Sequence, residues 1–314
     1  MHLNLALVVG SAVVGLLVGL TGTGGGALMT PMLVLFFGVT PSSAIASDLM
    51  AALFMKPAGV AIHWRRRTVN KEVMKYLCIG SVPAAFAGTY VMHLLGQSAG
   101  AEKTLEMVLG SALIIGSLAM LVRSMYIEKG TTGTDHVKAR PAPTIAVGVV
   151  GGFMVGLTSV GAGSLILVLL VMLYPTLRND HLVGTDLAQS IPLTFAATAG
   201  ALAFGHVNFA LTTSIIVGSV PMVIVGSLFS SRSNGFVLRR IIAGAVLLSG
   251  LKYVGVPIPT LGAAALVIAA MIAAITIRHR RLIRASGAAA TDPLVAEPVE
   301  DVVTLLPSRL DGDL

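Results

Sequence analysis

Two glycine-rich breaks, at residues 21–26 and 158–164, interrupt the apolar stretches of this sequence and offer its clearest chemistry. Each break precedes a short apolar piece that is expected to begin a helix. A helix N-terminus presents unpaired N–H groups and about half a positive charge, and glycines let an anion approach that backbone. The breaks therefore predict a site for a small anion, unless the glycines only permit tight turns and close helix packing. The site residues assigned at the breaks are Thr23, Gly24, Gly25, Gly26, Thr158, Gly161, Gly163 and Ser164.

Three ionisable residues and a glutamine lie inside apolar stretches, where charge is costly and often functional. Asp48 and Lys56 are eight residues apart and so share one helix face. Lys56 is expected to neutralise an anion or pair with a carboxylate, unless its chain extends to the membrane interface. Gln189 is expected to donate to an oxyanion or to a nearby backbone group. Asp48 and Asp186 either cap helix starts, the simpler interpretation, or take part in proton coupling.

No constellation typical of catalysis or metal binding is present in the sequence. It contains no H-E-x-x-H pair, and Cys78 is its single cysteine. A disulfide within one chain and a multi-cysteine metal site are therefore excluded. The sequence predicts neither an enzyme nor a bound metal or cofactor.

Composition defines the elements that must position these residues. Hydrophobic residues make up 55% of the chain and charged residues 11%, and the mean hydropathy is +0.90. These values exclude a soluble globular fold. The apolar runs are continuous rather than alternating, which favours membrane-spanning helices of roughly 20 residues over barrel strands. The predicted fold class is all-α, a polytopic transmembrane helical bundle.

The apolar runs predict eleven helical segments, two of which are too short to cross a bilayer. A hydrocarbon core of roughly 30 Å needs about 20 helical residues, so the short pieces are expected to form re-entrant hairpins with the broken helices before them. The segments are 3–20, 26–38, 43–63, 73–95, 105–125, 143–157, 163–174, 185–204, 208–230, 236–254 and 260–277.

An internal repeat organises the chain. The Gly-Leu-Thr triplet at 19–21 recurs at 156–158, an offset of 137 residues. At an offset of 138, Asp48 matches Asp186, and the Gly-Ser-Val-Pro sequence at 80–83 recurs at 218–221. Polar residues and prolines that hold one register over such a distance indicate two copies of one structural unit.

Basic residues predict how the copies are oriented, because Lys and Arg concentrate in cytoplasmic loops. The clusters at 65–75, 123–140, 232–240 and 278–284 all face the cytoplasm if each hairpin enters and leaves on one side. This arrangement gives about seven full crossings and inverts the second repeat relative to the first. The expected divisions are a first repeat at 1–128, a cytoplasmic linker at 129–142, a second repeat plus final helix at 143–280, and a disordered cytoplasmic tail at 281–314.

The paired pattern resembles the TauE/SafE family of sulfite exporters. The resemblance rests on residues 22–26, Pro31 and 44–49, with a second copy at 161–163 and 184–186, and covers roughly residues 5–275. It implies transport of sulfite, sulfonates or related sulfur-containing anions without ATP hydrolysis. The second copy departs from the first, with Ala162 in place of Gly25 and Val168 in place of Pro31. Strict symmetry of the two half-sites is therefore not expected.

The combined expectation is a secondary transporter, a permease of the cell (inner) membrane that moves a small anion by alternating access. Its partners are the anion and the lipid bilayer, with H⁺ as a candidate coupling ion and no nucleic acid. The oligomeric state is left open, a homo-oligomer included. A passive anion channel, or a membrane enzyme or assembly factor, is the alternative.

Overall fold

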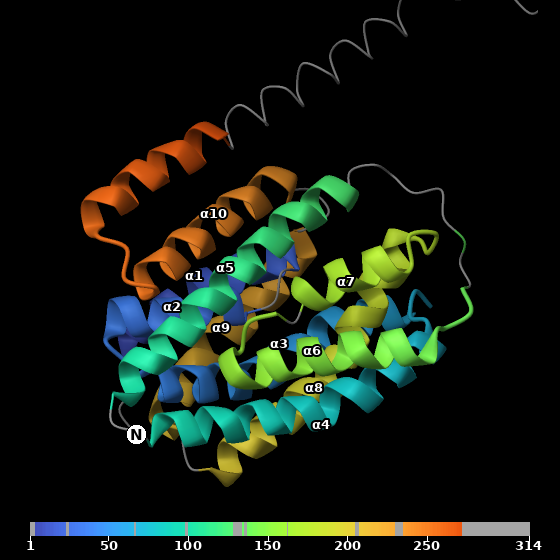
Figure 1. Cartoon of the computed structure of the whole chain (residues 1–314), viewed down its shortest axis with the longest axis horizontal. Coiled ribbons are helices and arrows are strands. Elements are labelled where there is room, and N and C mark those ends of the chain that lie inside the picture. The colour runs from blue at the N-terminus through green and yellow to red at the C-terminus, as the bar shows by residue number, and fades with distance from the viewer. Residues whose placement is uncertain are drawn as a thin grey trace, which may run out of the picture. The chain divides into compact units, whose positions relative to one another are not determined.

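The computed structural model describes residues 4–22, 25–65, 67–97, 100–127, 134, 137–161, 163–204, 207–229 and 235–271. Within these residues the chain is all-α, as predicted, and forms one compact unit that extends to Ala269 (Figure 1). A further apolar helix spans Ile258–Met271. The labelled helices are α1 (Leu5–Thr21), α2 (Gly26–Phe37), α3 (Pro41–Arg65), α4 (Lys71–Gly96), α5 (Ala101–Ile127), α6 (Pro141–Thr158), α7 (Leu165–Leu173), α8 (Asn179–Ala203), α9 (Phe209–Phe229) and α10 (Gly235–Tyr253).

The two short apolar pieces form short helices, as expected. The first is α2, with 12 residues, and the second is α7, with 9. Both are shorter than the roughly 20 residues that a membrane crossing requires. The predicted linker at 129–142 falls mostly outside the described residues, and the tail at 281–314 falls wholly outside them.

Several helices are suited to a lipid environment. Four spans among the described residues are long and apolar enough to cross a membrane: α4, Ala101–Arg123 of α5, α6 and α9. Helices α3 and α8 have 25 residues each, but they carry ionisable residues in their interiors. The structure is that of a multi-pass membrane protein, and the count of about seven crossings stays a prediction.

Helices α1–α5 pack against helices α6–α10 in a regular pattern. Helix α1 packs along α9, and α6 packs along α4. The first helix of each set therefore lies against the fourth helix of the other set. Helices α3 and α8 contact each other, and α5 and α10 run side by side (Figure 1). This pattern ties the two halves of the chain into one bundle.

The closest backbone contacts repeat in the register found in the sequence. A Cβ atom added to Gly15 would lie 2.8 Å from the Cα of Ser219, and one added to Gly152 would lie 2.6 Å from the Cα of Ser81. These two contacts are equivalent at offsets of 137 and 138 residues. Small residues permit such approaches between helices in lipid. The two-copy organisation is thus visible in the packing, whereas the inverted orientation of the copies stays a prediction.

Candidate functional site

The two glycine breaks meet inside the protein. A Cβ atom added to Gly26, the first residue of α2, would lie 2.6 Å from the carbonyl carbon of Ser159 at the end of α6. Ser159 and its repeat counterpart Gly22 both have left-handed backbones, with φ values of 60° and 62°. Helices α1 and α6 therefore end in the same way, and the end of α6 touches the start of α2.

A small enclosed cavity lies where the breaks meet. Its volume is about 10 Å³, and a cavity needs at least about 10–15 Å³ to hold one water molecule. It therefore admits no oxyanion in this conformation, and binding one requires the helices around it to separate. The cavity is lined by Gly25, Gly26, Leu49, Ala52, Lys56, Val155 and Ser159.

Asp48 links three elements at this cavity. Its Oδ2 atom accepts hydrogen bonds from the hydroxyls of Thr30 in α2, at 2.9 Å, and of Ser159, at 2.8 Å. Its Oδ1 atom is buried and has no hydrogen-bond partner among the described residues. A Cβ atom added to Gly25 would lie 3.6 Å from Oδ1, so this oxygen faces the first break. Asp48 thus keeps one acceptor available beside the cavity.

Asp186 holds the equivalent position in the second repeat. Its carboxyl faces the backbone amide of Gly163 and the side chain of Gln189. Its Oδ1 atom is buried without a partner among the described residues, as is the Nε2 atom of Gln189. The Oε1 atom of Gln189 accepts a hydrogen bond from the Ser81 hydroxyl at 3.0 Å. The second repeat therefore presents a buried amide donor as well as a buried carboxylate oxygen.

The interpretation of the two carboxyls as helix caps is wrong. Helix α3 begins at Pro41 and α8 at Asn179, so Asp48 and Asp186 lie well inside their own helices. An N-cap residue must precede the first helical turn, because only there are backbone N–H groups unpaired. Neither carboxylate can therefore cap the helix that contains it, and a role in proton coupling stays a prediction.

Lys56 is held between the repeats. Its ammonium donates to the hydroxyl of Thr194 and to the carbonyl oxygen of Ser190, at 3.5 Å, both in α8. Thr194 is the repeat counterpart of Lys56, so this contact joins two equivalent positions. The side chain is directed to α8.

Four side chains of alternating charge interact across this region, each with the next in the order Asp48, Lys56, Asp186 and Arg123. Lys56 interacts electrostatically with Asp48 and Asp186, and Asp186 also interacts with Arg123. Among the described residues, only Arg178 and Asp180 form an ion pair closer than 4 Å, and that pair is exposed. The four charges, three of them buried and Lys56 partly buried, are therefore near one another without direct ion-pair contact, and their formal sum is zero.

Arg123 counts in the sequence among the basic residues around the central loop, but the structure places it in the interior of the protein. It lies in α5 with an exposed fraction of 4%, and its Nη1 atom donates to the carbonyl oxygen of Gly163 at 2.6 Å. The sequence did carry a signal, because Arg123 falls within the predicted helix 105–125, where a charge is costly. Thr30, Ser81 and Ser159 are polar contacts of the site that were also not assigned from the sequence.

The backbone amides of the second break are mostly satisfied within the break. The N–H groups of Ser164, Leu165 and Ile166 all approach the carbonyl oxygen of Gly161, at 3.1–3.4 Å. The hydroxyl of Thr158 donates to the Met154 carbonyl oxygen at 2.8 Å. The Ser164 hydroxyl is buried without a partner among the described residues. Thr23 and Gly24 lie outside the described residues.

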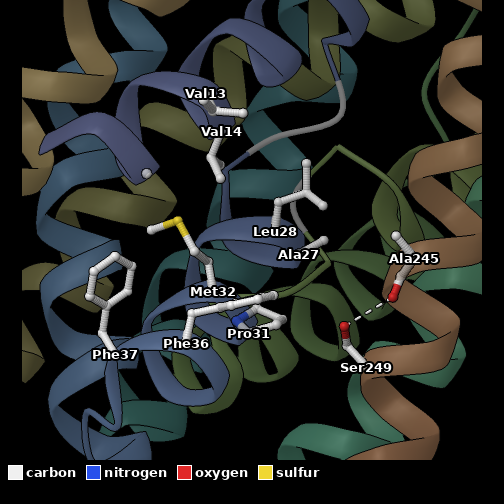
Figure 2. A pocket seen from close by; sticks show the side chains of 11 residues that line it. Val13, Val14, Ala27, Leu28, Pro31, Met32, Phe36, Phe37, Ala245 and Ser249 are labelled. Carbon is white, nitrogen blue, oxygen red and sulfur yellow. Dashed lines mark hydrogen bonds between the residues drawn. The ribbon is translucent and has the colours of Figure 1, made fainter. Parts of the chain in front are cut away.

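A larger pocket lies between α1, α2 and α10, but its chemistry does not suit an anion (Figure 2). Its volume is about 440 Å³, and the described residues that line it include no ionisable side chain. The Ser249 hydroxyl in its wall donates to the Ala245 carbonyl oxygen at 2.9 Å. The breaks and the four charges therefore remain the candidate site.

Replacing Ser159 with glycine is expected to lower transport without lowering the stability of the protein. The change removes a hydrogen bond to Asp48, worth about 1.5–3 kcal/mol, and relieves left-handed strain of roughly 1–2 kcal/mol. The apparent melting temperature should stay near that of the unaltered protein, whereas anion flux in liposomes should fall about tenfold. Gly22→Ala is the matched control, because it adds backbone strain where the added Cβ atom would meet no other atom of the described residues within 4 Å. Unchanged flux in Ser159→Gly would show that the contact has no role.

The fold defines a multi-pass membrane protein, and comparison with known proteins narrows this class to a membrane transporter. The family described as Sulfite exporter TauE/SafE matches residues 7–253, and the chain belongs to this family. The chain is similar to the Probable membrane transporter protein YjnA of Bacillus subtilis, with 36% identity over 80% of this chain and 100% of that protein. It is also 28% identical to the Probable membrane transporter protein MJ0441 of Methanocaldococcus jannaschii, over 56% of this chain and 64% of that protein. No solved structure matches.

Proposed function

We propose that the protein is a secondary transporter that moves a small sulfur-containing oxyanion, such as sulfite or an organosulfonate, by alternating access. The observation that supports this proposal is the meeting of the two glycine breaks at a closed cavity beside Lys56. A cation, an amide donor at Gln189 and flexible glycine backbone are groups that bind oxyanions. The family description supports this choice of substrate class, and the closed cavity favours a carrier over a passive channel.

A hydrogen bond that forms at only one of two equivalent positions in the repeats supports alternating access. The Thr185 hydroxyl accepts a hydrogen bond from the Asn70 backbone N–H at 2.9 Å. The equivalent residues in the other repeat are Ser47 and Asn208, and the Ser47 hydroxyl is buried without a partner among the described residues. Exchange of conformations between the two repeats would form the Ser47–Asn208 contact and break the Thr185–Asn70 contact. These two contacts are the proposed gates.

Cysteine pairs test the gates. In a Cys78→Ala background, crosslinking of cysteines at 70 and 185 should stop flux, and so should crosslinking at 47 and 208, with recovery after reduction. Each gate must open once in a transport cycle, so a fixed contact on either side blocks it. The four single-cysteine variants are the controls. Full flux through a protein with either crosslink complete would contradict the proposed gates.

We further propose H⁺ as the coupling ion. The four central charges sum to zero, so a bound anion leaves one negative charge uncompensated in the protein interior. Uncompensated buried charge is strongly unfavourable. Proton uptake on Asp48 or Asp186, each with one oxygen unpaired by described residues, restores neutrality. The anion and the proton would then cross together.

Reconstitution tests the function directly. Purified protein in liposomes should take up sulfite or a sulfonate with saturation, and an inward proton gradient should drive accumulation above equilibrium. Flux that rises linearly with concentration and never exceeds equilibrium would favour the channel. Absence of flux for every small oxyanion, with folded protein verified, would exclude the proposal.

A further inference from the structure

Two arginines outside the central cavity connect one helix pair to both glycine breaks. Arg123 in α5 donates to the carbonyl oxygen of Gly163 in the second break, at 2.6 Å. Arg239 in α10 donates through Nε to the carbonyl oxygen of Thr21 in the first break, at 3.0 Å. Helices α5 and α10 pack against each other, so one helix pair carries both guanidinium groups.

The electrostatics of this arginine pair are unbalanced. The two guanidiniums are close enough to interact as like charges. The carboxylate that interacts with Arg123 is Asp186, which is shared with Lys56. Counted beside the four central charges, which sum to zero, Arg239 adds one positive charge that lies next to Arg123 rather than at the cavity. Like charges removed from water repel strongly unless a counter-charge accompanies them.

Arg123 also has a donor to spare. A guanidinium carries five N–H donors in a planar fork that matches the oxygens of an oxyanion. Arg123 has an exposed fraction of 4%, and its Nε atom has no partner among the described residues. A buried donor without a partner costs about 1–3 kcal/mol, more when it is charged. A bound anion would satisfy it.

We propose that Arg123 and Arg239 form a second oxyanion subsite, separate from the central cavity. It accepts a group with three oxygens, such as sulfite or a sulfonate head group, which bridges the two guanidiniums. The anion occupies this subsite on its way to or from the cavity beside Lys56. The choice of anion rests on the proposed function, but binding at the subsite does not require transport.

Binding measured without transport tests this subsite. The probe is sulfite, added to the purified full-length protein, with binding followed by calorimetry and by the shift in melting temperature. In a Lys56→Gln background, which weakens the central site, sulfite should still bind. Adding Arg239→Gln should raise the apparent Kd about tenfold or more, and Arg239→Lys should raise it less, because lysine keeps the charge without the fork. Arg239 is only half-buried, so this variant is expected to fold.

Controls make each outcome decisive. Arg178→Gln alters an exposed, ion-paired arginine and should leave the Kd unchanged. Loss of all sulfite binding in Lys56→Gln alone would overturn the proposal, because only a central site would then exist. An unchanged Kd after Arg239→Gln would overturn it as well. Binding that depends on Arg239 without any flux would contradict the transport proposal and leave the subsite in place.

Discussion

Lys56→Gln is expected to lower oxyanion flux to the level of protein-free liposomes. The change removes the cation that adjoins both central carboxylates, so Asp48 and Asp186 lose their shared counter-charge. The anion also loses the cation that compensates its own charge at the cavity. A loss of only about 3 kcal/mol in the binding of an anion corresponds to a Kd more than a hundredfold higher. Initial uptake rates at several sulfite concentrations measure this effect.

Matched variants separate charge from position. Lys56→Arg keeps the cation and should retain part of the flux. Thr194→Val removes the hydroxyl that the Lys56 ammonium contacts and should cause a smaller loss than Lys56→Gln. Lys103→Gln alters an exposed lysine and should leave flux unchanged. Normal flux in folded Lys56→Gln would exclude Lys56 from the anion site.

Asp48→Asn is expected to abolish accumulation driven by a proton gradient while leaving anion exchange largely intact. The asparagine oxygen can still accept from Thr30 and Ser159, and its amide replaces the buried Oδ1 atom. The variant therefore imitates a permanently protonated carboxyl. The ratio of internal to external sulfite under an inward proton gradient should fall to about one.

Asp180→Asn is the control for this change. Asp180 is an exposed carboxyl paired with Arg178, so its loss should leave accumulation unaffected. Asp186→Asn tests whether the second carboxyl shares the same role. Accumulation at the unaltered level in Asp48→Asn would exclude this residue as the proton carrier.

Hydropathy and the repeat were enough to predict the helical framework. Segments expected at 26–38 and 208–230 are helices at Gly26–Phe37 and Phe209–Phe229. Such segments are apolar throughout, so their ends are marked by glycine or by polar residues. The start of α8 was missed by six residues because its first turn, at 179–184, includes Asn179, Asp180 and His181. This error made Asp186 look like a cap.

The polar contacts of the site depend on tertiary packing that no local pattern reports. Asp48 accepts from Ser159, which is 111 residues away along the chain, and Arg123 reaches Gly163 across 40 residues. Lys56 and Gln189 could be selected because a polar group inside an apolar helix is costly. Ser159 and Thr30 could not, because a hydroxyl in a membrane helix usually bonds to its own backbone.

Counterflow in liposomes tests transport by alternating access most directly. Vesicles that contain the protein and are preloaded with unlabelled sulfite should take up labelled sulfite faster than empty vesicles, because the loaded site returns through the same pair of gates. We predict this acceleration, with saturation by external sulfite and loss in Lys56→Gln. Equal uptake by loaded and empty vesicles, without saturation, would contradict an alternating-access carrier built on the two glycine breaks.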